Sequence, residues 1–163
     1  MPMHTVLTLP NATLRQVSHP IESFDAEVIL MFQNLATAME AGPGGVGIAA
    51  PQVGILKRAV VVDCNFSMRP CKHHGRLFMA NPQILEHDGE VLGREGCLSV
   101  PEWVGTVPRA KHVTVQFQNE KGELNTINTS GFEARVIQHE IDHLDGVLFI
   151  DRVVSTQDLI RRM

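Results

Sequence analysis

The stretch QHEIDHLDG, residues 138–146, decides how the rest of the chain is interpreted. His139 and His143 lie four residues apart in it, and Glu140 follows the first histidine. Residues four apart on a helix leave the same face, so a helix here presents two imidazoles beside a carboxylate. Because His-Glu-x-x-His on a helix is a metal-binding pattern of hydrolases, the stretch predicts a metal site with hydrolytic chemistry.

The residues around this motif predict a long helix over 131–144. Phe132 and Val136 share the face of His139, which places apolar surface beside the expected metal. The remaining apolar residues are expected to face the core: Ile137, Ile141 and Leu144. The alternative is an amphipathic helix with chance histidines on its polar side, since the motif has false positives.

Two histidines do not complete a catalytic site, which has three protein ligands and one open position. Downstream, Asp151 and Asp158 are carboxylates outside any recognisable motif. Upstream, EGCLS (residues 95–99) offers Cys97, whose thiolate would bind a divalent transition metal strongly. The alternative for Cys97 is a small buried residue, the commoner role of a cysteine.

A third stretch, GVGIAAPQ (residues 45–52), is rich in small residues that would let a ligand lie along the backbone. Gln52 at its end offers an amide N–H donor. A Gly-x-Gly pair alone indicates only a turn, and an isolated Gln52 would more often be a surface residue. The stretch indicates a ligand site only in combination with the stretches 95–99 and 138–146.

Together, the stretches 45–52, 95–99 and 138–146 resemble the three signatures of the peptide deformylase family, complete and in the same order. The resemblance covers essentially the whole chain. It implies an α+β fold in which antiparallel sheets surround a central helix with the metal-binding motif, and one catalytic domain over 1–163. It also implies removal of the N-terminal formyl group from formyl-methionine of nascent polypeptides, with release of formate.

The resemblance assigns roles to matching residues of this chain. Cys97 becomes the third metal ligand beside His139 and His143. The ion is usually Fe(II), and Ni(II), Co(II) or Zn(II) can substitute. Metal-bound water attacks the formyl carbon, and Glu140 acts as general base and then acid. Two N–H donors, from Gln52 and the Leu98 backbone, stabilise the developing oxyanion. Five residues are expected to bind substrate: Gly45, Val46, Gly47, Phe132 and Val136.

Two other functions stay open from the residues alone. A zincin-type metallopeptidase shares the His-Glu-x-x-His motif, but the chain lacks a downstream ligand motif after residue 146. A non-catalytic relative that binds formylated peptides would have no use for the Glu140 carboxylate.

Composition places the chain in a broad class. Its 163 residues suit one compact domain, and 44% apolar with 20% charged residues is ordinary for a globular protein. A net charge of −4 gives no basic footprint for nucleic acid, and no apolar run reaches the length of a membrane span. Three cysteines form no disulfide framework, and no signal peptide is evident, so a bacterial cytoplasm is expected, with an organelle origin left open. The expected partners are formylated nascent peptides at the ribosome exit.

Periodicity predicts helices separated by hairpin strands, an α+β arrangement with mostly antiparallel sheet. A first helix is expected over 21–41, capped by Ser23 or Asp25, and a short last helix after Ser155. That last helix is shorter than in many bacterial family members, which puts in doubt any ribosome contact made through it. Strands are expected over 59–64, 77–85, 90–92, 112–118, 123–128 and 147–150.

Two smaller features carry alternatives. CKHHG (residues 71–75) has metal-ligand residue types, but without a fourth ligand a mobile polar loop is the preferred interpretation. Glu95 and Arg109 are either a pair that orients the metal site or a surface ion pair, and the sequence does not separate the two.

Overall fold

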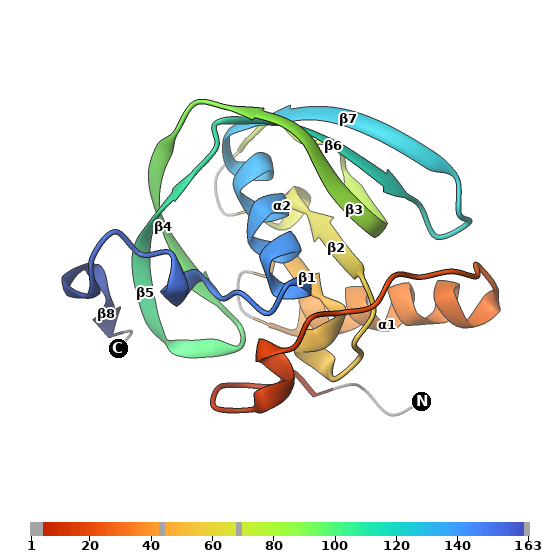
Figure 1. The fold of residues 1–163 in the computed structure, drawn as a ribbon, viewed down its shortest axis with the longest axis horizontal. Helices are drawn as coiled ribbons and strands as arrows, with labels where there is room; N and C mark the ends of the chain where they lie inside the picture. The colour runs from red at the N-terminus through yellow and green to blue at the C-terminus, as the bar shows by residue number, and fades with distance from the viewer. Residues whose placement is uncertain (1–4, 43–44, 68–69, 162–163) are drawn as a thin grey trace.

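The computed structural model describes residues 5–42, 45–67 and 70–161. Two α-helices accompany a five-stranded sheet of order β1-β2-β3-β6-β7 and a three-stranded sheet of order β4-β5-β8 (Figure 1). Every pair of neighbouring strands in both sheets is antiparallel, which confirms the α+β class. In the described part of the chain, no helix is long and apolar enough to cross a membrane.

The elements have the following bounds. The helices are α1 (Ala26–Ala41) and α2 (Gly131–Leu144). The larger sheet contains β1 (Gly47–Ala49), β2 (Ala59–Asp63), β3 (Arg76–Asp88), β6 (His112–Gln118) and β7 (Leu124–Ser130). The smaller sheet contains β4 (Val91–Cys97), β5 (Val100–Arg109) and β8 (Ile160–Arg161). Short 3-10 helices are η1 (Ala12–Arg15), η2 (Ala50–Val53), η3 (Cys64–Phe66), η4 (Phe149–Asp151) and η5 (Thr156–Asp158).

Helix α2 has the bounds that the sequence predicts, because glycines mark both of its ends. Gly131 has φ +63°, which allows the sharp turn from β7 into the helix, and Gly146 has φ +75° just past its end. The three apolar residues expected in the core are buried: Ile137, Ile141 and Leu144. His139 lies on another face of the helix, together with Phe132 and Val136.

Helix α1 begins at Ala26 rather than at residue 21, so the predicted start was wrong by five residues. The Asp25 side chain accepts hydrogen bonds from the backbone N–H groups of Glu27 and Val28, at 3.1 and 3.2 Å, and thereby caps the helix. Ile21 is buried outside the helix, where its N–H donates to Asn81 Oδ1 at 2.8 Å. Ile21 is apolar and has the spacing of the helix's buried face, so the sequence pattern predicts a helix that starts before Asp25.

Strand β2 is buried along its whole length, which explains its unbroken apolar run. Val60 and Val62 belong to a core cluster that includes Val136 and Ile137 of α2. Ala59 and Val61 face the other way, into a cluster with residues of α1. The two helices therefore cover opposite faces of the sheet at this strand, and α2 is held against rigid structure.

The predicted strand over 147–150 is wrong. Residues 149–151 form the 3-10 helix η4 instead, because the Asp151 carboxylate accepts a hydrogen bond from the N–H of Leu148 at 2.9 Å. Leu148 and Phe149 are buried in a third core cluster with Cys97 and Val107. The apolar run thus reflects burial of a turn rather than pairing of a strand.

The predicted C-terminal helix is also wrong. Ser155 does cap an element, but that element is the single 3-10 turn η5, and the chain then extends into β8. Strand β8 pairs with β5 through Trp103 and Val104. In the described residues, pairing with β5 takes the place of the predicted helix.

Besides β8, two other strands were not predicted. Strand β1 has only three residues, Gly, Ile and Ala, and no alternation to detect. Strand β5 contains Pro101 and Pro108, which normally argue against a strand. Strand β8 pairs with only two residues of β5, Trp103 and Val104. Both prolines lie at other positions, and there this side of β5 has no strand neighbour.

Candidate metal and catalytic site

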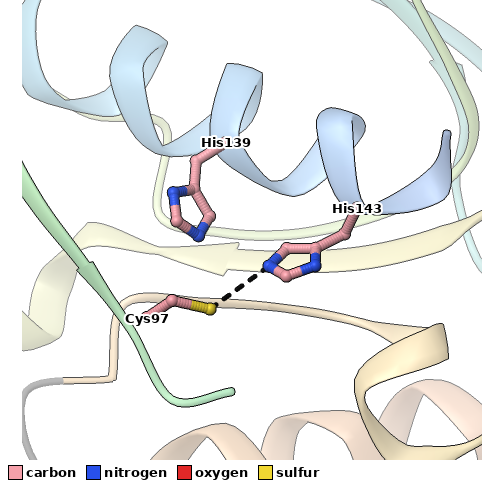
Figure 2. Close-up of side chains that lie close together, drawn as sticks. All are labelled: Cys97, His139 and His143. Carbon is pink, nitrogen blue, oxygen red and sulfur yellow. Dashed lines mark hydrogen bonds between the residues drawn. The ribbon is translucent and has the colours of Figure 1, made fainter. Parts of the chain in front are cut away.

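Three side chains that are far apart in the sequence converge on one point. Cys97 comes from the end of β4, and His139 and His143 come from successive turns of α2 (Figure 2). One ligand atom from each lies within 4.8 Å of the other two, and Cys97 Sγ is 3.3 Å from His143 Nε2. A thiolate and two imidazoles at this separation suit a divalent transition metal.

His139 is oriented by a buried carboxylate. Its Nδ1–H donates to Glu95 Oε1 at 2.9 Å, which leaves Nε2 directed toward Cys97 and His143. Burial by itself lowers the pKa of His139, but hydrogen bonds with Cys97 and Glu95 raise it well above the ordinary value. His143 has no such carboxylate, so burial keeps its pKa well below the ordinary value and its imidazole neutral.

Glu95 is itself fixed by two arginines. Arg109 donates twice to its carboxylate, at 2.9 and 3.0 Å, and Arg135 donates once, at 2.6 Å. Burial opposes ionisation of Glu95, but hydrogen bonds from His139 and Arg109 outweigh it and lower the pKa to about 2. Because Glu95 and Arg109 are both buried, the pair orients the site, and the surface ion-pair alternative is wrong.

Glu140 is a buried carboxylate facing the same pocket. It is 4% exposed, and its Oε1 has no hydrogen-bond partner among the described residues. Burial raises its pKa to about 7. A Cβ placed on Gly47 would lie 2.7 Å from Glu140 Oε2, so the glycine is required for the carboxylate to lie against β1. A carboxyl that titrates near neutral pH is suited to accept and donate a proton.

Gln52 is buried at 2% exposure, so the surface-residue alternative is wrong. Its Oε1 accepts a hydrogen bond from the Ala49 N–H at 2.9 Å. Its Nε2 donates to Ser99 Oγ at 3.1 Å and lies 3.6 Å from Cys97 Sγ. The amide nitrogen is therefore on the metal-facing side of the residue.

A cavity of about 300 Å³ connects these groups. All five residues expected to bind substrate line it: Gly45, Val46, Gly47, Phe132 and Val136. Gln52, Leu98 and Glu140 line the same cavity with Cys97 and His139. Phe132 is 40% exposed at the surface, whereas Val136 is buried nearer to His139. The structure thus brings every predicted site residue except His143 to one cavity wall, and His143 lies buried behind Cys97.

Three residues near the site were missed from the sequence. Arg94 and Arg135 line the cavity, and Ser99 lies behind Gln52. Arg135 is one turn before His139 on α2, so helical spacing offered a signal for it. Ser99 is the last residue of the EGCLS stretch, but its contact with Gln52, 47 residues away, has no local signal.

The other metal-ligand candidates do not join a cluster. In the described ranges, Cys97, His139 and His143 are the one group of such side chains that could hold an ion, so residues 71–75 form no second site. His74 instead contacts Glu133, through its backbone N–H at 2.6 Å and its Nδ1 at 2.5 Å. Asp151 pairs with Arg15 on the surface, and neither Asp151 nor Asp158 belongs to the cluster, so the described residues offer no downstream ligand for a zincin-type site.

The fold and the site together define a metal-dependent hydrolase. The family model described as Polypeptide deformylase matches residues 3–158. The chain belongs to the polypeptide deformylase family.

Individual relatives agree with this placement over nearly the whole chain. A peptide deformylase of Syntrophomonas wolfei is 42% identical over 157 residues, covering 96% of this chain and 97% of the relative. Peptide deformylase 1 of Bacillus subtilis is 40% identical over 153 residues, 94% of this chain and 91% of the relative. The crystal structure of peptide deformylase from Thermotoga maritima has a TM-score of 0.87 at 36% identity, covering 95% of this chain and 100% of that one. A Met-Ala-Ser-bound peptide deformylase structure from Acinetobacter baumannii has a TM-score of 0.85 at 34% identity, with coverage of 93% and 99%.

Proposed function

We propose that this protein removes the formyl group from the N-terminal formyl-methionine of nascent polypeptides and releases formate. One observation carries the proposal: Glu140, a buried carboxylate whose Oε1 has no hydrogen-bond partner among the described residues, lines the same cavity as Cys97 and His139. Family membership supplies the reaction, and this arrangement supplies the groups that amide hydrolysis requires.

The proposed cofactor is one divalent metal ion, with Fe(II) as the preferred ion. The donor set fits: Glu95 orients the ring of His139, and His143 is held neutral and ready to bind a cation. His139, whose pKa is raised, would release a proton when the ion binds. When bound, the ion would polarise the formyl oxygen and make a water molecule more acidic. Ni(II), Co(II) and Zn(II) suit the same ligands.

The protein residues would divide the remaining work. Glu140 takes a proton from the attacking water and delivers it to the leaving amine, which needs a carboxyl with a pKa near the working pH. The amide nitrogen of Gln52 and the backbone N–H of Leu98 donate to the formyl oxygen as it gains charge. Each such donor is worth roughly 3 kcal/mol in other hydrolases.

The cavity walls suggest how the substrate would bind. Strand β1 is an edge strand, and the Val46 carbonyl accepts a hydrogen bond from the Asp63 N–H at 2.8 Å, so the backbone groups at Val46 and Gly47 that do not bond to β2 would pair with an extended peptide. Val136 and Phe132 provide an apolar wall for the methionine side chain. The Acinetobacter baumannii relative binds Met-Ala-Ser, a peptide that begins with methionine.

The wider setting is proposed from the family. Residues 1–163 form a single catalytic domain in the cytoplasm of a bacterium and act on formylated chains as they leave the ribosome. We place α2 at the centre of the fold, supported by its contacts with β1, β2, β6 and β7 and by hydrogen bonds from Arg135 to the Val91 and Val107 carbonyls.

The test separates deformylation from peptide-bond cleavage. Protein purified without oxygen is loaded with Fe(II) and given formyl-Met-Ala-Ser and, separately, a longer unformylated peptide. Formate release from the first and no fragments from the second are expected. Fragments from the second peptide without formate from the first would assign the site to a metallopeptidase.

A further inference from the structure

Ser99 is a buried polar residue that touches the site from behind. It is 0% exposed and does not line the cavity, so it cannot contact substrate. Its Oγ accepts a hydrogen bond from Gln52 Nε2 at 3.1 Å. A buried hydroxyl that makes this contact is held for its partner rather than for solvent.

The two ends of the Gln52 carboxamide have different partners. A primary carboxamide can turn over and exchange its oxygen and nitrogen, because the two ends have nearly the same shape. Here the Ala49 N–H requires an oxygen at one end, at 2.9 Å, and Ser99 Oγ receives the nitrogen at the other. The pair of contacts therefore selects the orientation in which the N–H donor faces the cavity.

We infer that Ser99 is a positioning residue that holds the Gln52 amide ready to donate to the charged oxygen of the reaction. The inference rests on the proposed function, which gives Gln52 that role. The amide nitrogen carries two hydrogens. One stays on Ser99, and the other, which lies toward Cys97 Sγ at 3.6 Å, would turn to the oxygen as charge develops.

Loss of the Ser99 hydroxyl should weaken turnover more than substrate binding. Without it, the Ala49 contact and the longer contact with Cys97 Sγ remain to fix the carboxamide, and the donor is less well aimed in the transition state. One neutral hydrogen bond corresponds to roughly a 5- to 10-fold effect, smaller than the roughly 100-fold or greater effect of removing the donor itself. Since the ground-state substrate carries little charge on this oxygen, KM should change less than kcat.

The metal ligand should be unaffected by the same change. The Ser99 backbone N–H lies 3.4 Å from Cys97 Sγ, and a substitution of the side chain leaves this backbone group in place. Ser99→Ala should therefore retain the metal content and the absorption spectrum of the Co(II)-loaded protein.

A double-mutant cycle tests the inference, using the wild type, Ser99→Ala, Gln52→Leu and the double variant with formyl-Met-Ala-Ser. Ser99→Ala is expected to lower kcat about 5- to 10-fold in the wild type and to have no further effect in Gln52→Leu. An equal loss in both backgrounds, or a rise in KM with kcat unchanged, would overturn the role of Ser99.

Ser18→Ala is the matched control. Ser18 is also buried, at 3% exposure, and its Oγ has no hydrogen-bond partner among the described residues. This variant should leave kcat unchanged, and thermal unfolding of each variant checks the fold. If Ser99→Ala does not fold, Ser99→Cys, with a weaker acceptor of similar shape, should show the same coupling at reduced size. A wild type that releases no formate would instead refute the proposed function, and the role of Ser99 with it.

Discussion

Glu140 lies in an environment that disfavours its charged form. It is a carboxylate in a position that solvent hardly reaches, with one oxygen unpaired among the described residues and a pKa raised to about 7. Folding to a stable structure gives no reason for such a group, since an unpaired buried charge costs free energy. Perturbed acids of this kind gather at functional sites, which supports a role in proton transfer.

The roles of the ligand and the base should separate on mutation. Cys97→Ala removes a bond to the ion, so metal content after dialysis should fall. Glu140→Gln keeps all three ligands, so metal content should stay while kcat falls roughly 10²- to 10⁴-fold. Metal analysis and formate release measure the two effects. Equal loss of metal in both variants would contradict the division of roles.

Glu140 should also make the stability of the metal-free protein depend on pH. Its pKa rises from 4.5 to about 7 on folding, so stability is intact below pH 4.5 and declines as the pH rises toward 7. The loss is on the order of 3 kcal/mol at pH 8. Urea unfolding of metal-free wild type and Glu140→Gln should show the variant gaining stability relative to the wild type between pH 5 and pH 8. A constant difference across this range would be inconsistent with a raised pKa.

At the residue scale, the sequence predicted the metal ligands but not every residue that holds the site in place. Motif spacing places His139 and His143 together because both lie on one helix. The association of Cys97 with them came from the resemblance to a family, since a contact across 46 residues has no local signal. The role of Ser99 was missed for the same reason, because its contact with Gln52 exists only in the folded chain.

At the element scale, Glu95 joins strand β4 to strand β5 and helix α2. Its carboxylate accepts from Arg109 of β5 and from Arg135 and His139 of α2. Asp142 of α2 accepts from Arg109 at 2.6 Å and extends the network. The network fixes the distance between the strand that carries Cys97 and the helix that carries both histidines.

Breaking this network should affect stability and metal binding together. Glu95→Gln removes the charge that Arg109 and Arg135 share and leaves Arg109 with Asp142 alone, which should cost about 3–5 kcal/mol of unfolding free energy at pH 7. Loss of the His139 contact should weaken metal affinity roughly 10- to 100-fold. The wild-type stabilisation by Glu95 is present above pH 4.5 and is lost as the pH falls toward 2.

Glu102→Gln is the control for Glu95→Gln. Glu102 pairs with Arg161 at 3.6 Å on the surface, where an ion pair contributes little. Denaturant unfolding should show almost no change in this variant, and metal titration none. If both variants behaved alike, the buried network would have no special role.

The elements themselves were predictable to the extent that their signals are local. Helix α2 and strand β6 have the predicted bounds, because glycine ends and strict alternation are local features. Strand β5 was missed because it contains Pro101 and Pro108, which are tolerated here because β8 does not pair at these positions. The strand over 147–150 was predicted wrongly because a buried turn and a buried strand have the same kind of short apolar run in the sequence.

At the scale of the whole molecule, the two antiparallel sheets position Cys97 and helix α2 beside the same cavity. The larger sheet supports α2 through β1, β2, β6 and β7, and the smaller sheet supplies Cys97. Figure 1 shows α2 in blue beside the yellow strand β2 and below the arch of β3, β6 and β7. The donor set formed in this way does not select one metal by geometry alone.

The metal should therefore control how long the enzyme lasts in air. With Fe(II), activity should decay on exposure to oxygen, because oxidation affects the iron and the adjacent Cys97 sulfur. Ni(II) and Co(II) forms should retain activity. Anaerobic reconstitution with each ion, followed by timed assays in air, measures this. An iron form as durable as the nickel form would refute the prediction, and a zinc form with the highest activity would indicate a zinc enzyme.

The central claim is that the cavity hydrolyses a formyl amide at the N-terminus. The most direct measurement compares kcat/KM for formyl-Met-Ala-Ser and acetyl-Met-Ala-Ser with the Fe(II)-loaded protein, scoring formate, acetate and free amine. A preference for the formyl peptide of roughly 100-fold or more is expected, since one added methyl group must fit between the metal site and the Gln52 amide. Glu140→Gln should abolish formate release. Comparable rates for the two peptides, or formate release that survives Glu140→Gln, would contradict the account.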